Sequence, residues 1–451
     1  MAQRFDLIVH GGTVVTPVGH DAADIGVVAG HIAEIGNLAQ ADAGHRLDAH
    51  GLHVLPGVID SQVHFREPGG EHKEDLATGT AAAALGGVTA VFEMPNTDPP
   101  TTSAAALADK LARARGRAWV DHAFFIGAAP DNLDRLAELE RLPGCCGVKI
   151  FMGSSTGTLL LADDANVERA LRAGRRRVAV HAEDEARLKE RRAIAESGGG
   201  AELHPEWRDA ECARRATERL LALAKRTRRP VHVLHVSTAE EMALLATRPK
   251  WVSVECTPQH LTLEAPDCYR RLGTLAQMNP PIRDARHRAA LWAGLAGGVV
   301  DVIGSDHAPH SLAEKARPYP ESPSGMPGVQ TLLPIMLDHV HAGRLGLDRL
   351  VELVSGAPAR LFQVERKGAI RVGFDADLSL VDLAARREIT DDWLASKCGW
   401  SPFAGTTVTG WPMATVVRGQ VVMRDGELVG RPAGAPVRFA DLIADAAAGG
   451  A

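Results

Sequence analysis

The sequence predicts an α/β protein in which a (β/α)8 barrel of the TIM type carries a small flanking β-sandwich domain built from both chain ends. Two observations support this fold class. Between about residues 57 and 310, eight short β-branched runs each end in a polar cluster and alternate with segments of helical periodicity. Before and after that region, apolar stretches alternate with turns that contain Gly and Pro, which is typical of small β-sheets.

The barrel is predicted from the repetition of the strand and helix patterns. Eight strand–helix units favour a (β/α)8 barrel, in which the active site lies at the C-terminal ends of the strands. The intervening segments contain few helix breakers, as in SAAALADKLARARGR and RDAECARRATERLLALAKRTR. The expected strands, in chain order, are GVIDSQVHF, VTAVFEMPN, VDHAFFIGA, GVKIFMGSS, VAVHAED, VHVLHVS, WVSVECTP and VDVIGSDHAP.

The two chain ends are each too short to form a convincing domain alone. The first end contains FDLIVHGGTVVTP, DIGVVAGHIAEIG and HRLDAHGLHVLPG, and the second begins with GAIRVGFDADLSLVDL. We therefore expect the two ends to pair with each other beside the barrel. The predicted division assigns residues 1–55 and 366–451 to the β-sandwich and residues 56–365 to the barrel.

Composition excludes several classes of protein. Lys and Arg number 50 against 56 Asp and Glu, and the resulting net charge of −6 argues against binding to nucleic acid or an acidic membrane. No apolar stretch reaches the roughly 18 residues of a membrane span, and the N-terminus lacks the apolar core of a signal peptide. Six cysteines without a C-x-x-C pair favour a reducing compartment. We therefore expect a soluble, cytoplasmic protein.

Two basic runs, Arg175–Arg177 and Arg226–Arg229, each precede an expected strand. They could form a binding patch or the ends of solvated helices. Because cations are favoured at helix C-termini, we expect solvated helix ends.

Candidate metal ligands fall where the expected strands finish. The first strand leads to His64, the fifth to His181, the sixth to His235 and the eighth to Asp306. Imidazole and carboxylate ligands together suit a metal such as zinc. A single histidine of this kind is more often a hydrogen-bonded core residue, so the prediction depends on the joint pattern, in which all four residues reach the same mouth of the barrel.

Lys149 lies in the apolar stretch GVKIFM, where burial disfavours the charged ammonium. A neutral buried amine can combine with carbon dioxide to give a carbamate, which is an anionic oxygen ligand for one metal or a bridge between two. The alternative is a lysine whose head extends to the rim of the barrel. Asp306 can ligate a metal or transfer a proton, and its alternative role is to cap the next helix.

Several ordered stretches carry a family resemblance. They resemble the amidohydrolase superfamily and, within it, the dihydroorotase family, over nearly the whole chain. The stretches are QVHFREPG (62–69), MPNT (94–97), KIFMGSS (149–155), HAED (181–184), HVST (235–238), DHAPH (306–310) and GWSPF (399–403).

The resemblance implies a metal-dependent cyclic amidohydrolase. The implied reaction is the reversible cyclisation of N-carbamoyl-L-aspartate to dihydroorotate in pyrimidine biosynthesis, with Asp306 as the catalytic proton carrier. The implied cofactor is one or two Zn2+ ions. The corresponding ligands in this chain are His64, carboxylated Lys149, His181, His235 and Asp306.

The resemblance also implies how the substrate is held. The carboxylate of the substrate would be bound by Arg66, Asn96 and Asn279, since a guanidinium fork with amide donors suits a carboxylate. His310 would contact the substrate from the loop after the eighth strand, whereas His307 is expected to structure that turn. A homodimer and a possible association with aspartate transcarbamoylase are family-based expectations.

One position departs from the family pattern. The usual His-x-His motif of the first strand is here Gln62-Val63-His64, and the resemblance is closest to a lysine-bridged branch with glutamine at this position. A glutamine amide oxygen is a weaker zinc ligand than imidazole, so the number of metals stays open. Two alternative functions also stay open. One is an allantoinase or hydantoinase that acts on a ring without a carboxylate, and the other is a non-catalytic companion of aspartate transcarbamoylase.

Overall fold

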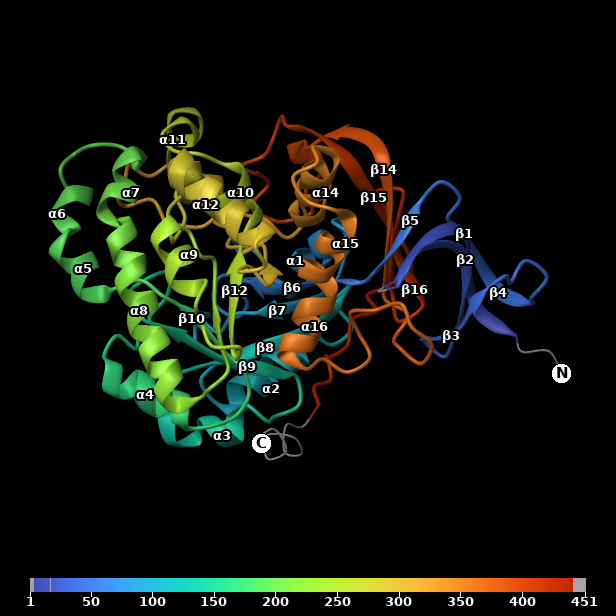
Figure 1. Ribbon diagram of the computed structural model, residues 1–451, viewed down its shortest axis with the longest axis horizontal. Coiled ribbons are helices and arrows are strands. Elements are labelled where there is room, and N and C mark those ends of the chain that lie inside the picture. The colour runs from blue at the N-terminus through green and yellow to red at the C-terminus, as the bar shows by residue number, and fades with distance from the viewer. Residues whose placement is uncertain (1–3, 17, 441–451) are drawn as a thin grey trace.

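The computed structural model describes residues 4–16 and 18–440 (Figure 1). Residues 1–3, 17 and 441–451 of the two predicted end regions lie outside the described residues. Figure 1 shows a barrel surrounded by helices, with a β-domain at one side in which blue strands from the start of the chain lie beside red strands from its end. The predicted fold class is confirmed.

Eight parallel strands form the barrel, one from each of the eight predicted runs. They pair in chain order, and a β-bridge between Val63 and His307 joins the first strand to the segment that follows the last. The backbone N–H of His64 donates to the carbonyl of His307 at 2.7 Å, which nearly closes the barrel. The strands are β6 (Val58–Val63), β7 (Val88–Glu93), β8 (Asp121–Gly127), β9 (Cys145–Phe151), β10 (Val178–His181), β11 (Val231–Val233), β12 (Val252–Cys256) and β13 (Val302–Ile303).

Helices connect the strands and surround the barrel. The two segments predicted as helices form α2 (Ala104–Ala114) and α8 (Ala210–Thr227), and the side chains of Ser103 and Asp209 cap their first turns. The described residues contain no helix that is long and apolar enough to cross a membrane. The other α-helices are α1 (Leu76–Leu85), α3 (Leu136–Leu139), α4 (Asp164–Arg172), α5 (Glu185–Glu190), α6 (Arg192–Ala195), α7 (His204–Trp207), α9 (Ala239–Leu245), α10 (Pro258–Thr262), α11 (Asp267–Leu272), α12 (Ala285–Ala296), α13 (Leu312–Lys315), α14 (Leu332–His341), α15 (Leu347–Val351) and α16 (Ala357–Phe362).

The two chain ends form one nine-stranded sheet, so the predicted pairing of the ends is confirmed. They meet where β5 runs antiparallel to β14, with Leu55 opposite Ser379. The sheet continues through β15, β16 and β17 on one side and through β1, β2 and β3 on the other, while β4 also pairs with β1. The strands are β1 (Phe5–Thr16), β2 (Gly19–Val28), β3 (His31–Gly36), β4 (Ala43–Asp48), β5 (His53–Pro56), β14 (Leu378–Glu388), β15 (Thr407–Val417), β16 (Gln420–Arg424) and β17 (Glu427–Leu428).

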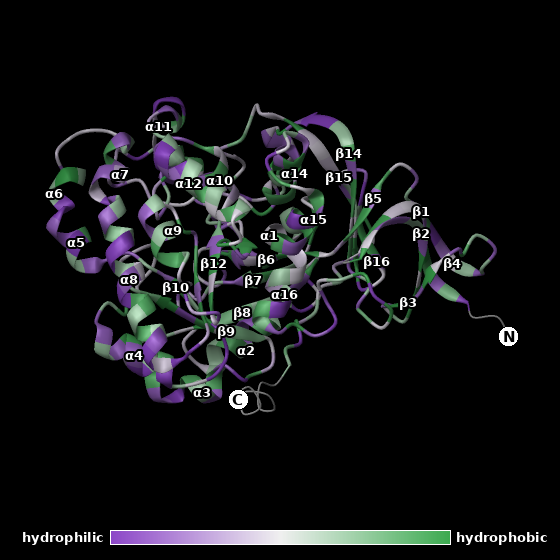
Figure 2. Cartoon of the chain, in the orientation of Figure 1, coloured by the Kyte–Doolittle hydropathy of each residue, from purple (hydrophilic) through white to green (hydrophobic). Residues whose placement is uncertain are grey.

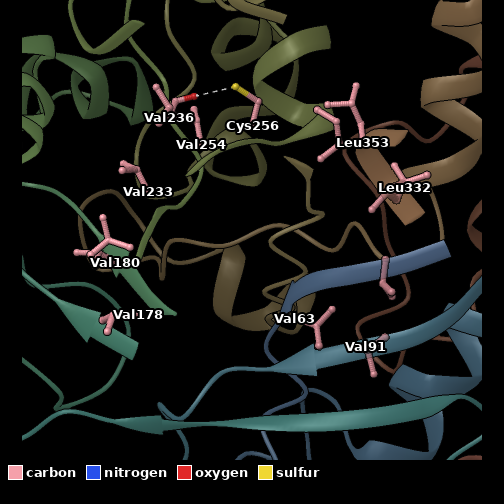
Figure 3. Packing of buried hydrophobic residues seen from close by; sticks show 14 of the residues in the cluster. Val63, Val91, Val178, Val180, Val233, Val236, Val254, Cys256, Leu332 and Leu353 are labelled. Atoms are coloured by element: carbon pink, nitrogen blue, oxygen red, sulfur yellow. Dashed lines mark hydrogen bonds between the residues drawn. The ribbon is translucent and has the colours of Figure 1, made fainter. Parts of the chain in front are cut away.

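Buried aliphatic side chains fill the layer between the strands and the helices (Figure 3). This layer includes Val148 and Ile150 on β9 and Val180 on β10. Successive side chains of a strand point to opposite faces, so Lys149 and His181 point into the barrel. Figure 2 shows that the outer helices α4, α5 and α8 carry both hydrophobic and hydrophilic residues. The same alternation that builds the core therefore directs polar side chains into the barrel.

Candidate active site

The predicted ligands gather at the C-terminal mouth of the barrel. His64 directly follows β6, His181 is the last residue of β10, and His235 and Asp306 lie just beyond β11 and β13. Lys149 lies within β9, where it pairs in register with Ala179, two residues before His181 on the neighbouring strand. All five side chains are at least nine-tenths buried.

Three site residues have a backbone conformation that L-residues rarely adopt. The φ angles of Arg66, His235 and Asp306 are +64°, +38° and +46°. Such left-handed conformations cost of order 1–3 kcal/mol each and persist when the surrounding structure fixes them. The strain therefore lies where the chain leaves the barrel strands and turns these side chains toward its mouth.

One half of the site consists of Gln62, His64 and Asp306. The amide Nε2 of Gln62 donates to Oδ1 of Asp306 at 2.9 Å, and Nε2 of His64 lies 3.2 Å from the same oxygen. On its other side, Nδ1 of His64 lies 2.7 Å from Oδ1 of Asn96. Oε1 of Gln62 is buried and has no hydrogen-bond partner among the described residues. We call this group the glutamine half.

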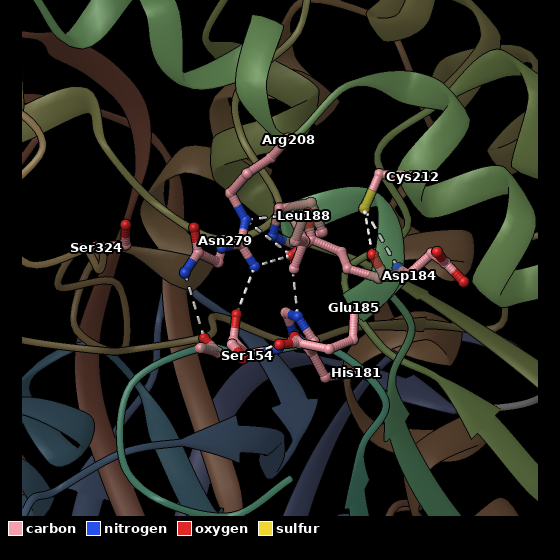
Figure 4. Close-up of polar contacts among 12 residues, drawn as sticks. Ser154, His181, Asp184, Glu185, Leu188, Arg208, Cys212, Asn279 and Ser324 are labelled. Carbon is pink, nitrogen blue, oxygen red and sulfur yellow. Dashed lines mark hydrogen bonds and ion pairs between the residues drawn. The ribbon is translucent and has the colours of Figure 1, made fainter. Parts of the chain in front are cut away.

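The other half consists of His181 and His235, together with Glu183 and Arg208. Nδ1 of His181 lies 3.1 Å from Nε2 of His235, and Nε2 of His181 lies 2.9 Å from Oε2 of Glu183. Arg208 Nε donates to both oxygens of Glu183 at 3.1 Å, and its Nη2 donates to the carbonyl of Ser154 at 2.8 Å (Figure 4). We call this group the histidine half.

Burial sets the electrostatics of the histidine half. Burial alone would raise the pKa of Glu183, but the Arg208 guanidinium and His181 hold that pKa well below its usual range. Burial also lowers the pKa of His181 and of His235, so both imidazoles are neutral at neutral pH. Neutral imidazole is the form that ligates metals.

Lys149 and Asp306 are an opposed pair in the barrel interior. Burial lowers the pKa of Lys149, and the carboxylates of Asp306 and Glu255 oppose that effect. Burial raises the pKa of Asp306, and the Lys149 ammonium opposes it. The Lys149 amine lies 4.4 Å from the centroid of the Phe151 ring, inside the barrel and away from its rim. This position does not match a lysine that extends to the rim.

The predicted substrate-binding residues divide into two groups. Nη2 of Arg66 lies 3.3 Å from Nε2 of His310, and Nε of Arg66 donates to the carbonyl of Pro309 at 3.1 Å. Asn96 joins the site through His64. Asn279 lines a cavity of about 490 Å³ that Ser154 and Arg208 of the histidine half also line, and its Oδ1 lies 2.9 Å from Nε2 of His204. Among the residues that the structure describes, no hydrogen bond joins Arg66 to either asparagine.

Sequence reasoning missed the support of the histidine half. Glu183 belongs to the HAED motif, and a carboxylate two residues after a candidate ligand is a signal that could have identified it. Arg208 lies between α7 and α8, 25 residues further along, and no local pattern connects it to Glu183. His307 behaves as expected for a turn residue, because its Nδ1 accepts from the backbone N–H groups of Gly328 and Val329.

Two further clusters in the described part of the chain bring three candidate ligand atoms together. One consists of His10, Asp48 and His50 at the surface of the β-domain. The other consists of Asp121, Asp375 and Asp377, and all three of these carboxylates pair with Lys367. The second cluster is therefore an internally neutralised ion-pair network. The four predicted His and Asp ligands at the barrel mouth form two close pairs instead.

Comparison with known proteins gives the family of this site. A family model described as "Amidohydrolase family" matches residues 53–422. The chain belongs to the amidohydrolase family. This enzyme family is generally metal-dependent. The donor set at the barrel mouth fits a metal, because it offers a carboxylate and two neutral imidazoles whose facing nitrogens, Nδ1 of His181 and Nε2 of His235, lie 3.1 Å apart.

Named relatives of this amidohydrolase differ in the ring on which they act. A dihydroorotase from Halobacterium salinarum is 40% identical over 387 residues, which cover 85% of this chain and 89% of that protein. An allantoinase from Rubrobacter xylanophilus is 38% identical over 450 residues, covering 96% and 98%. The solved structure of an L-hydantoinase (dihydropyrimidinase) from Arthrobacter aurescens matches with a TM-score of 0.91 and 32% identity, covering 96% and 99%.

Proposed function

We propose that the protein is a dihydroorotase that interconverts N-carbamoyl-L-aspartate and dihydroorotate in pyrimidine biosynthesis. The observation that carries this proposal is Arg66. It is a buried guanidinium, 6% exposed, at the mouth of the barrel beside His310, with no carboxylate among its hydrogen-bond partners. Such a group is suited to bind the free carboxylate of a substrate. The similarity to relatives named dihydroorotase supports the same substrate class.

We propose zinc as the metal, with His64, Lys149, His181, His235 and Asp306 as the residues available to hold it. When bound, the metal supplies the Lewis acidity that polarises the ring amide carbonyl and lowers the pKa of water. Lys149 would join as a carbamate. In that reaction its neutral amine forms an N–C bond to dissolved carbon dioxide and releases one proton. Burial of Lys149 supports this step, because burial favours the neutral amine.

The remaining residues would orient the substrate and transfer protons. In the hydrolytic direction, Asp306 accepts a proton from the attacking water and delivers it to the ring nitrogen as the C–N bond breaks. Arg66, Asn96 and Asn279 hold the substrate carboxylate, and His310 contacts the substrate beside Arg66. Fixing the carboxylate also orients the ring amide, which accounts for a large part of the rate in reactions of this kind.

The biological setting extends the proposal. We propose a cytoplasmic homodimer that belongs to a lysine-bridged branch with glutamine at position 62, with possible association with aspartate transcarbamoylase. We also propose domain boundaries at residues 55/56 and 365/366. If the chain were instead a non-catalytic companion of aspartate transcarbamoylase, it would not need a bound metal. The metal content of the purified protein tests that alternative.

A second candidate function is an allantoinase or hydantoinase, and the allantoinase relative with 98% of its length covered favours it. Arg66→Met separates the two candidates. For a dihydroorotase, KM for dihydroorotate should rise about 10- to 100-fold, since a hydrogen-bonded charge contributes roughly 1.5–3 kcal/mol. Allantoin and hydantoin lack a carboxylate, so turnover of those rings should change little.

The direct test is an assay of purified, zinc-supplied protein with both N-carbamoyl-L-aspartate and dihydroorotate. We expect turnover in both directions. Protein that carries zinc and turns over neither compound would overturn the dihydroorotase proposal, and turnover of allantoin or hydantoin by the same preparation would establish the second candidate.

A further inference from the structure

We infer that this chain holds a single divalent metal ion, in the histidine half of the site, and that Gln62 positions Asp306 instead of ligating a second ion. The inference rests on the proposed metal-dependent function. It adds the number of ions and the role of Gln62, and it restricts the five available ligands to His181, His235 and Lys149, with Lys149 holding one ion instead of bridging two. It follows from three features: the orientation of the Gln62 amide, the chemistry of an amide nitrogen, and the arrangement of the two histidines.

The orientation of the Gln62 amide is fixed by its neighbour. Oδ1 of Asp306 accepts from Nε2 of Gln62 at 2.9 Å. If the amide were turned over, Oε1 would face Oδ1, and the ionised carboxylate would meet a second acceptor instead of a donor. The side chain is 1% exposed, so bulk solvent does not reach that contact. The N–H face of the amide is therefore the one directed at Asp306.

This orientation makes the glutamine half a poor site for a cation. The amide nitrogen has no lone pair for a metal, and its N–H carries partial positive charge. An ion between His64 and Asp306 would compete with the hydrogen bond from Gln62. Turning Oε1 toward the ion would give it a neutral ligand weaker than imidazole and remove the donor from Asp306. His64 offers such an ion at most one nitrogen, because its Nδ1 contacts Oδ1 of Asn96 and only its Nε2 faces Asp306.

The histidine half has the opposite character. Glu183 lies 2.9 Å from Nε2 of His181, and an anionic neighbour at that nitrogen favours the tautomer with the proton on Nε2 and the lone pair on Nδ1. That Nδ1 lies 3.1 Å from Nε2 of His235. Two imidazole nitrogens on a tetrahedral zinc, with bonds of about 2.0–2.1 Å, are about 3.3 Å apart. The two rings are therefore close to the spacing that one shared ion requires.

The histidine half is also held from outside the site. Arg208 clamps both oxygens of Glu183 and anchors on the carbonyl of Ser154 (Figure 4). Lys149 lies in the adjacent strand and faces the same interior. The histidine half therefore supplies two imidazoles, and Lys149 supplies one further ligand. Glu183 and Arg208 provide the hydrogen bonding that usually orients a ligating histidine. Asp306 then remains free of a bridging role and keeps its hydrogen bond from Gln62.

The experiment counts metal ions per chain. Zinc-loaded protein is dialysed against metal-free buffer and its zinc is measured by inductively coupled plasma mass spectrometry. We expect one zinc per wild-type chain and two per chain for Gln62→His, which restores the second imidazole of the motif. His64→Asn should retain one zinc, and His181→Asn should lose it. Two zinc ions per wild-type chain, or loss of zinc from His64→Asn, would overturn the inference.

A spectroscopic readout removes dependence on folding differences between variants. In protein loaded with Co2+, electron paramagnetic resonance should show an isolated ion for the wild type and spin coupling between two ions for Gln62→His. A coupled pair in the wild type would contradict the inference, even if the variants fail to fold.

The outcome is independent of the proposed substrate. One zinc per chain without turnover of dihydroorotate would refute the proposed function and leave this inference standing. Two zinc ions with turnover would refute the inference and leave the function standing.

Discussion

The two halves of the site differ in how their polar atoms are satisfied. In the glutamine half, Gln62 donates to Oδ1 of Asp306, and Nε2 of His64 lies 3.2 Å from the same oxygen. In the histidine half, Glu183 and Arg208 hold His181 from behind, and the two imidazole nitrogens face each other. The two halves both lie at the ends of barrel strands, yet they offer a metal different atoms. The Gln62 amide directs an N–H group toward Asp306, whereas a neutral imidazole offers a nitrogen lone pair.

The largest expected effect comes from Asp306 in the glutamine half. Asp306→Asn should lower kcat by about 10²- to 10⁴-fold, because it removes the proposed general base. If Asp306 positions protons and does not hold the resident ion, zinc content should stay at the wild-type value. Steady-state kinetics and metal analysis of the same preparation measure both quantities.

Asp392→Asn, which changes an exposed carboxylate, is the control for Asp306→Asn and should alter neither quantity. A loss of zinc from Asp306→Asn would mean that Asp306 holds the ion, which would contradict the assignment of the ion to the histidine half.

The support of the histidine half gives the next largest effect. Glu183→Gln should weaken zinc binding by about 10- to 100-fold, because it removes the carboxylate that orients His181. It should also lower the free energy of unfolding, since Arg208 would be left as an unpaired buried charge. Competition with a chromophoric chelator measures the affinity, and thermal unfolding measures the stability.

Glu140→Gln is the matched control for this loss of stability. Glu140 also pairs with a buried arginine, Arg229, outside the candidate site, and both side chains are 2% exposed. The control should lose comparable stability and keep its zinc affinity. Equal weakening of zinc binding in both variants would mean that Glu183 acts only through overall stability.

The smallest expected effect is on the pH dependence of stability. The pKa of Glu183 is held below its ordinary value near 4.5, so the folded state favours the ionised carboxylate. Its contribution is complete above about pH 5 and is lost as the pH falls below the ordinary value, because the unfolded chain then binds the proton first. Denaturant titrations of zinc-free protein should show this loss of stability, and Glu183→Gln should reduce its slope. An unchanged slope in Glu183→Gln would contradict the ion pair.

Much of the barrel could be predicted from the sequence because its signals are local. β-branched runs identified all eight strands, and strand alternation between Val148 and Ile150 directs Lys149 inward. The pairing of Gln62 with Asp306 could not be predicted, because these residues are 244 positions apart and meet only when the barrel closes. For the same reason, the contact of Arg208 with Glu183 has no sequence signal.

One expectation about the basic runs was wrong in part. Arg229 is buried, pairs with Glu140 and donates to the carbonyl of Arg176. Arg177 donates to the carbonyls of Leu361, Val231 and Trp251. These guanidiniums therefore satisfy buried backbone oxygens between neighbouring elements instead of ending solvated helices. Charge periodicity alone does not reveal such a role, since it depends on which carbonyls the fold leaves without donors.

The most direct measurement of the contrast between the two halves is anomalous X-ray scattering at the zinc edge from crystals of zinc-loaded protein. We predict one anomalous peak, in contact with Nδ1 of His181 and Nε2 of His235, with the Gln62 amide still bonded to Asp306. A peak beside His64 with Oε1 of Gln62 as its ligand, alone or as one of two peaks, would contradict the account.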